Sequence, residues 1–292
     1  MRALALAWCV LTGANTAVAA PVAVQDDASQ TVSLPAPAQR IVSLSPHATE
    51  LLFAAGAGTH VVGVSEYSDY PAQASRLPSV GSSTTLDLER ILALKPDLIV
   101  TWKSGNSAAQ VAKLQVAGIA VFASEPRSFA DIASSLERLG KLAGTQQSAD
   151  AAANAFRSRW QQLSTQYAGR PEVSVFYQIW RDPLMTLNDS HLVSAAIRLC
   201  GGRNVFGKLP TLAPTVNTEA VLLAAPEAIV TGSGAKDDDL APWRAFTQIP
   251  AVKRNNLFSV NADVMTRGTP RILDGTEALC KQLDQVRARR GE

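Results

Sequence analysis

The sequence predicts an α/β protein of two similar lobes, each with a mostly parallel sheet, joined by one long rigid helix and enclosing a ligand cleft. Residues 86–101 (LDLERILALKPDLIVT) and 216–231 (VNTEAVLLAAPEAIVT) share one pattern: a helix-capping residue, then a glutamate, an apolar run and a proline leading into a buried strand. Strand-like and helix-like segments alternate on both sides of the chain's middle, which is typical of parallel sheets covered by helices. Residues 128–170, between these regions, contain no strand pattern.

The first residues, 1–19, have the features of a secretory signal peptide. Arg2 provides a positive start, and an apolar core and a small-x-small cleavage site (AVA) follow it. Cys9 lies in that core without the surroundings of a lipid-attachment cysteine. No later segment reaches the roughly 18 apolar residues of a membrane-spanning helix. Cleavage would remove Arg2 and lower the net charge from +2 to +1, which gives no reason to expect a nucleic acid or an anionic membrane surface as partner.

The first lobe is predicted at residues 40–127, after an N-terminal lead of residues 20–39 that ends in a Pro/Ala-rich stretch. Apolar runs predict its strands, and Ser45-Pro46 and Gly56 predict the beginning and end of its first helix. Its expected strands are 40–44, 61–65, 97–102 and 119–123, with a further helix near 108–117.

The connector at residues 128–170 is predicted to be helical. Residues 129–144 have apolar side chains at helical spacing, and a second helix of about 20 residues follows, roughly 30 Å long. Strong helix formers make a stiffer strut than a Gly- and Ser-rich hinge. Residues 171–292 form the expected second lobe, with strands at 174–179 and 257–261, the second repeated segment and a closing helix at 270–283.

The sequence contains no catalytic motif: it has no G-x-S-x-G elbow, no phosphate-binding G-x-x-x-x-G-K-[ST] and no G-x-G-x-x-G after a strand. In an exported chain whose remaining cysteines are Cys200 and Cys280, a disulfide is favoured, and the alternative is two separate buried thiols. His47, His60 and His191 are spread over both lobes, which does not predict a zinc or manganese centre. His47 alone lies where the floor of a cleft is expected, at the start of the first helix.

Side chains that directly follow strands are the best candidates for ligand contacts, because parallel sheets bind ligands outside the carboxyl ends of their strands. Tyr67 and Trp102 follow strands of the first lobe, and Trp180 follows the first strand of the second lobe. The alternative is that these rings anchor loops by packing. Asp263 and Arg267 follow the last strand and are either polar ligand contacts or a solvated local ion pair.

Several segments resemble a known family. They are RIVSLSPHATELLFAAG, VVGVSEYSDYP, LERILALKPDLIVTW and the series LCGG, NVF, PRI and LC, and they cover the chain from Arg40 to about Gln285. These segments are similar to the periplasmic substrate-binding proteins of ABC importers, within the helical-backbone class that binds metal chelates, and particularly to its vitamin B12 (cobalamin) receptors. The resemblance implies two Rossmann-like lobes joined by one long rigid helix.

The resemblance also implies roles for single residues. It implies that the corrin ring contacts Tyr67, Trp102, Asp263 and Arg267. It implies docking of two surface glutamates, Glu89 and Glu219, into arginine pockets of the membrane subunits, and a disulfide between Cys200 and Cys280. The alternative for the glutamates is that they are exposed acids favoured at helix starts by the helix dipole.

The predicted ligand-binding positions also include three that depart from the cobalamin receptors. Ser83 and Ala213 stand where those receptors have tryptophans, and Ile179 stands where they have a phenylalanine, although the neighbouring Trp180 can substitute for it. Each missing ring removes apolar contact with a flat macrocycle, worth about 1–3 kcal/mol. These departures bear on ligand choice rather than on the class of protein.

We therefore expect a soluble, monomeric periplasmic protein that captures cobalamin or a related corrinoid and delivers it to the permease and ATPase subunits of an ABC importer. We expect no catalysis, no catalytic cofactor, no protein-bound metal and no nucleic acid partner. A haem receptor is the main alternative and would require Tyr67 or His47 at the cleft centre as an iron ligand. A ferric-siderophore receptor would require several arginines, for which Arg181 and Arg267 are the obvious candidates. An exported α/β hydrolase would require a nucleophile–base pair.

Overall fold

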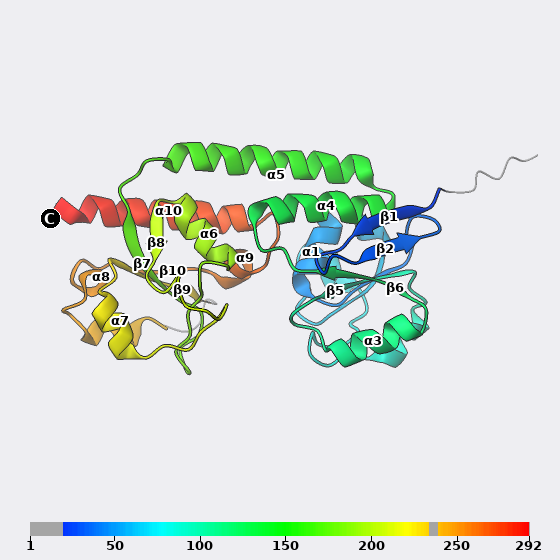
Figure 1. The fold of residues 1–292 in the computed structure, drawn as a ribbon, viewed down its shortest axis with the longest axis horizontal. Coiled ribbons are helices and arrows are strands. Elements are labelled where there is room, and N and C mark those ends of the chain that lie inside the picture. Colours follow the sequence, from blue (N-terminus) through cyan, green and yellow to red (C-terminus); the bar gives the residue numbers. More distant parts are fainter. Residues whose placement is uncertain (1–19, 234–238, 292) are drawn as a thin grey trace, which may run out of the picture.

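The computed structural model describes residues 20–233 and 239–291, so the predicted signal peptide and Cys9 lie outside the described residues. Two α/β lobes lie side by side, and a layer of long helices runs across both (Figure 1). Each lobe contains a four-stranded parallel sheet. This arrangement confirms the predicted fold class. No helix among the described residues is long and apolar enough to cross a membrane.

The sheet of the first lobe has the strand order β4-β3-β5-β6. Its strands are β3 (Ile41–Ser43), β4 (Val61–Val64), β5 (Leu98–Trp102) and β6 (Ala120–Ser124). The helices around it are α1 (Pro46–Ala54), α2 (Leu88–Ala93) and α3 (Ala108–Val116), with short 3-10 turns η1 (Gly58–His60) and η2 (Ala74–Arg76). The hydroxyl of Ser45 caps α1 by accepting a hydrogen bond from the Ala48 amide, as the Ser-Pro pair predicts.

The second lobe repeats this topology with the strand order β10-β9-β7-β8. Its strands are β7 (Val173–Gln178), β8 (Gly202–Asn204), β9 (Ala228–Ser233) and β10 (Leu257–Asn261). Its helices are α6 (Leu192–Leu199), α7 (Thr218–Ala224), α8 (Pro250–Lys253), α9 (Ala262–Thr266) and α10 (Ile272–Ala288), with 3-10 turns η3 (Ala241–Ala245) and η4 (Arg289–Gly291). Numbered along each lobe, the four strands are ordered 2-1-3-4 in both. The two repeated segments supply the third strand and its preceding helix in each lobe.

Two consecutive helices, α4 (Phe129–Ala143) and α5 (Gln146–Tyr167), connect the lobes. Helix α5 has 22 residues and is therefore about 33 Å long. It packs on α1 of the first lobe and on α6 and α10 of the second, and Figure 1 shows it above both lobes. Gly140 permits this pairing of α4 with α5, because a Cβ at that position would lie 2.1 Å from the Cβ of Ala149. The predicted strut is thus a helical pair packed on both lobes.

The N-terminal lead contains a β-hairpin that the sequence interpretation missed. Strands β1 (Val22–Gln25) and β2 (Thr31–Leu34) pair antiparallel and pack on α4 and β6. Asp27 fastens the hairpin to the first lobe: one carboxylate oxygen accepts from the Glu125 amide at 2.6 Å, and the other pairs with Arg138 at 2.7 Å.

The predicted disulfide between Cys200 and Cys280 is confirmed. It joins the end of α6 to α10 inside the second lobe, with a Cα–Cα distance of 4.7 Å, and both residues are fully buried. The alternative of two separate thiols is therefore wrong.

Candidate ligand-binding cleft

A cavity of about 860 Å³ lies between the lobes. The first lobe contributes Pro46, His47, Trp102, Ser104, Glu125, Pro126 and Arg127, and the second lobe contributes, among others, Tyr177, Ile179, Trp180, His191, Leu212, Gly232 and Arg267. Most of these residues lie at or just beyond the carboxyl ends of β3, β5, β6, β7, β9 and β10. In the 2-1-3-4 order the topological switch point lies between strands 1 and 3, and residues that follow these two strands line the cavity in both lobes.

Two exposed indole rings line the cleft. Trp102 is 37% exposed; its amide donates to the Asn106 Oδ1 at 2.6 Å, and its ring meets His47 edge-on at 6.0 Å between centroids. Trp180 is 61% exposed, and its Nε1 donates to the Asp182 carbonyl at 2.8 Å. Both rings are held by local contacts while much of their surface faces open space. Such rings are suited to packing against a large flat ligand.

His47 lies in the cleft floor, as its position at the start of α1 predicted. Its Nδ1 is 3.0 Å from the Ser45 hydroxyl, and its Nε2 is 3.2 Å from the Ser124 hydroxyl. Burial lowers the pKa of His47 to about 4, although the Glu125 carboxylate opposes this shift. The imidazole is therefore neutral at physiological pH, and both of its nitrogens are engaged within the first lobe.

His191 lies on the opposite wall, at the start of α6. Its Nδ1 accepts a hydrogen bond from the Val193 amide at 3.1 Å and so caps the helix. Burial lowers the pKa of His191 to about 4, again against the influence of Glu125. A neutral imidazole that accepts at Nδ1 carries its proton on Nε2. This second nitrogen is the polar atom that His191 can offer to a ligand.

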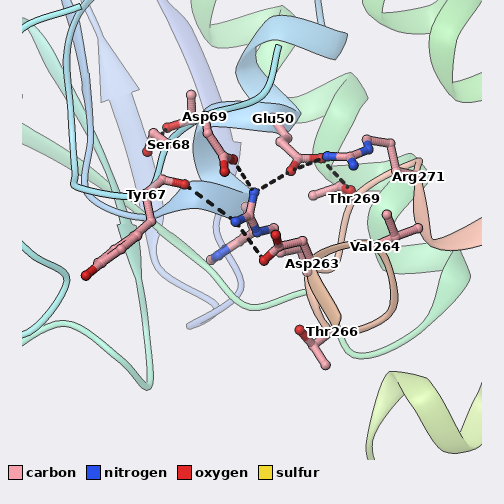
Figure 2. Close-up of polar contacts among 12 residues, drawn as sticks. Glu50, Tyr67, Ser68, Asp69, Asp263, Val264, Thr266, Thr269 and Arg271 are labelled. Atoms are coloured by element: carbon pink, nitrogen blue, oxygen red, sulfur yellow. Dashed lines mark hydrogen bonds and ion pairs between the residues drawn. The ribbon is translucent and has the colours of Figure 1, made fainter. Parts of the chain in front are cut away.

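Arg267 lines the cleft from the second lobe but bonds to carboxylates of both lobes. Its Nη1 donates to Glu50 at 3.0 Å and to Asp69 at 2.9 Å, and its Nη2 donates to Asp263 at 2.9 Å (Figure 2). Burial of Asp69 acts to raise its pKa, but the hydrogen bond from Arg267 acts in the opposite direction. The pKa of Asp69 therefore lies below its ordinary value. The pairing of Asp263 with Arg267 is the local ion pair considered in the sequence interpretation, here enlarged into a network across the lobes.

Four of the eight predicted ligand residues line the cavity and four do not. Those that line it are Trp102, Ile179, Trp180 and Arg267. Tyr67 is 79% exposed, with a left-handed backbone (φ 62°), and its ring points away from Asp69 and Asp263 in Figure 2. Ser83 presents its carbonyl to Asn106, Ala213 packs on the core, and Asp263 contacts Arg267 from outside the cavity.

Several lining residues were missed by the sequence interpretation. Glu125 follows the strand expected at 119–123, so the rule that selected Trp102 also applies to it. Leu212 directly precedes Ala213, the position at which the cobalamin receptors have a tryptophan. Its side chain is 38% exposed and lines the cavity. The buried Tyr177 hydroxyl has no hydrogen-bond partner among the described residues. No sequence pattern indicated Tyr177 as a cleft residue, because it lies within the predicted strand at 174–179 and has no feature that distinguishes it from a core residue.

The two repeated glutamates occupy equivalent exposed positions. Glu89 and Glu219 each lie in the first turn of a short helix, α2 or α7. Asp87 caps α2 by accepting from the Arg90 amide at 3.0 Å, and Asn217 caps α7 by accepting from the Ala220 amide at 2.8 Å. The capping pattern predicted from the sequence is thus present in both lobes.

Known proteins resemble this chain over most of its length. The profile of a periplasmic binding protein family matches residues 41–264. A curated vitamin B12-binding protein of Vibrio cholerae is 41% identical over 250 residues, covering 85% of this chain and 90% of that protein. A second, from Vibrio parahaemolyticus, is 35% identical over 256 residues, covering 87% and 92%.

Solved structures show the same relationship. The crystal structure of a periplasmic vitamin B12-binding protein of Vibrio cholerae superposes with a TM-score of 0.79 at 39% identity, covering 86% of this chain and 98% of that one. A periplasmic haem-binding protein of a Roseiflexus species superposes with a TM-score of 0.74 at 22% identity, covering 85% and 99%. At 22% identity, the similarity to the haem-binding protein shows a shared fold only.

Proposed function

Because this chain belongs to the periplasmic binding protein family, we propose that it captures cobalamin or a related corrinoid in the interlobe cleft and delivers it to an ABC importer. It is a binding protein rather than an enzyme. The permease and ATPase subunits of the importer are its proposed partners, the periplasm is its proposed location, and residues 1–19 are the proposed export signal.

The balance of charged residues that line the cleft is the observation that favours a corrinoid as the ligand. Its charged lining residues within the described part of the chain are three acids and three bases: Glu125, Asp182, Asp239, Arg127, Arg181 and Arg267. His47 and His191 add no charge at neutral pH, because burial lowers each pKa to about 4. A balanced wall with two exposed indole rings suits a large, flat, nearly neutral ligand edged with carboxamides, which describes a corrinoid.

The same residues give less support to the two alternative chelates. Both nitrogens of His47 are engaged with serine hydroxyls, and Tyr67 lies outside the cavity, so neither of the two side chains expected to bind a haem iron is placed for it. An anionic ferric siderophore calls for uncompensated positive charge. Arg267 is instead paired with three carboxylates.

Within the cleft, each wall has a proposed role. Trp102 and Trp180 pack against the macrocycle, with Ile179 and Leu212 completing the apolar surface. His191 donates from Nε2 to a peripheral amide carbonyl, and Arg267 supplies further donors. Leu212 and Trp180 take over the apolar contact that the departures at Ala213 and Ile179 would otherwise remove.

Delivery to the importer is proposed to use Glu89 and Glu219. Both are exposed acids at the same place in the two repeated segments, so a partner with two similar subunits can meet them together. Carboxylates pair strongly with arginine in charge-assisted, bidentate hydrogen bonds. This symmetry is the reason to prefer docking over a purely helix-capping role for the two acids.

Titration of the mature chain by calorimetry tests the ligand. Cyanocobalamin, dicyanocobinamide and hemin are compared, and a response to the two corrinoids with little response to hemin is expected. The variant Val116→Ala, which changes an exposed apolar residue on α3 outside the cleft, is the control and should bind as the wild type does. Binding of hemin without any corrinoid response would overturn the proposal.

Transport assays test docking separately. Glu89→Ala combined with Glu219→Ala should leave ligand affinity unchanged and abolish ligand uptake by cells. Glu66→Ala combined with Glu172→Ala, which removes two exposed acids outside the repeated positions, is the control and should change neither ligand affinity nor uptake. Normal uptake by the Glu89/Glu219 double variant would count against the docking role.

A further inference from the structure

Arg267, the arginine that lines the cleft, is hydrogen-bonded to a buried carboxylate. Glu50, on α1 of the first lobe, has a side chain only 2% exposed. Its Oε1 accepts hydrogen bonds from Arg267 Nη1 and Arg271 Nη1, each at 3.0 Å, and its Oε2 accepts from the Thr269 hydroxyl at 3.0 Å (Figure 2). All three donors come from the segment between α9 and α10 in the second lobe. One carboxylate of the first lobe therefore accepts three hydrogen bonds from a single short segment of the second lobe.

We propose that Glu50 is a positioning residue of this receptor: it holds Arg267 at the cleft wall and fixes the two lobes relative to each other. The part of this inference that concerns ligand affinity rests on the proposed function. The part that concerns lobe geometry does not depend on which ligand is bound.

The partners of Arg267 differ in how far water can replace them. Asp69 and Asp263 are 61% and 57% exposed, so solvent competes for both, whereas Glu50 is shielded. Exposed ion pairs contribute little, while loss of one partner of a buried pair leaves an uncompensated charge at high cost. A ligand oxygen can thus replace Asp69 or Asp263 at the guanidinium while Glu50 keeps the side chain in place.

The contact between Glu50 and the 267–271 segment is bordered by cavities. Glu50 borders a second cavity of about 630 Å³, whose lining also includes Tyr70 and Arg271. The Arg271 guanidinium stacks on the Tyr70 ring at 3.9 Å, which adds another contact between the lobes. Arg267 lines the cleft while Glu50 and Arg271 line this second cavity, so the hydrogen bonds of Glu50 join residues that border two cavities.

A distance measurement without ligand tests the role of Glu50 in lobe geometry. Leu92→Cys and Leu223→Cys place one spin label on each lobe, at side chains that are 46% and 88% exposed, and pulsed electron resonance reports the distance between them. Glu50→Gln keeps the side-chain shape and removes the charge, and it should broaden or shift the distance distribution. Glu277→Gln, which disrupts the more exposed pair with Arg159 on the connector, is the matched control and should not. An unchanged distribution for Glu50→Gln would overturn the inference.

A double-mutant cycle with cyanocobalamin tests whether Glu50 acts through Arg267. Glu50→Gln and Arg267→Gln should each weaken binding about tenfold, and the double variant should be about as weak as either one, because the second change removes nothing further. Independent, multiplicative losses would overturn the positioning role. If Glu50→Gln does not fold, Thr269→Val replaces it in both the distance measurement and the binding cycle. This variant removes one hydrogen-bond donor to Glu50, so smaller changes in the same direction are expected. If the wild type binds no corrinoid, the proposed function fails, and the distance measurement still decides the lobe geometry.

Discussion

Acidification from pH 7 to pH 5 should destabilise the protein through its two cleft histidines. Burial lowers the pKa of His47 and of His191 to about 4, whereas an unfolded histidine titrates near 6.5. Between these values the unfolded chain binds protons that the folded chain does not. Stability therefore rises with pH across this window and is lost as the pH falls from about 6.5 toward 4.

The expected loss follows from the size of the shift. At pH 5 an unfolded histidine is almost fully protonated and a folded one with a pKa of about 4 is mostly neutral, so each contributes a loss of about 2 kcal/mol. The two together give about 4 kcal/mol. Asp69, Glu137, Glu227 and Glu277 have pKa values below their ordinary ones, so the stability they contribute is lost mainly at more acidic pH, outside this window.

Urea unfolding at pH 7, 6 and 5 measures this loss. His191→Asn is the informative variant, because asparagine can still cap α6 but does not titrate. It should remove about half of the pH dependence, and His47→Gln should remove a similar share. Wild-type stability that stays constant between pH 7 and pH 5, or an undiminished slope in both variants, would refute the assignment of these histidines as neutral buried groups.

Two further predictions concern the cleft and the disulfide. Trp180→Ala should weaken corrinoid binding about 30- to 100-fold by calorimetry, because the ring is 61% exposed and covering on the order of 100 Å² of it is worth about 2.5 kcal/mol; an unchanged affinity would remove Trp180 from the site. Replacing Cys200 and Cys280 by alanine should lower the free energy of unfolding by up to about 4–5 kcal/mol, since the bond closes a loop across 80 positions. Equal melting temperatures for wild type and variant in scanning calorimetry would contradict this.

Local patterns in the sequence predicted the repeated core of the fold. Capping residues and prolines act over a few positions, so Asp87 and Asn217 cap helices where the repeat places them. The rule that ligands bind beyond the strand ends located Trp102 and Trp180, because parallel strands bring their carboxyl ends to one edge. The same rule also selected Tyr67, which has a left-handed backbone and is not among the residues that line the cavity.

The N-terminal hairpin shows where local patterns were too weak. Strands β1 and β2 have only four residues each, and a two-stranded hairpin of that length is not stable by itself. Its stability depends on packing against α4 and on Asp27 meeting Arg138, 111 positions away. No window of sequence contains that contact.

Local sequence patterns were enough to predict the two α/β lobes, the helical connector, the paired cysteines and the two tryptophans that line the cleft, because apolar periodicity, caps and strand ends are properties of neighbouring residues. The polar contacts beside the cleft could not be predicted in this way. Glu50 and Arg267 are 217 positions apart, and they meet because the strut sets one lobe against the other. Their contact depends on the orientation of two packed bodies, which is fixed by the sum of many distant contacts rather than by any local pattern.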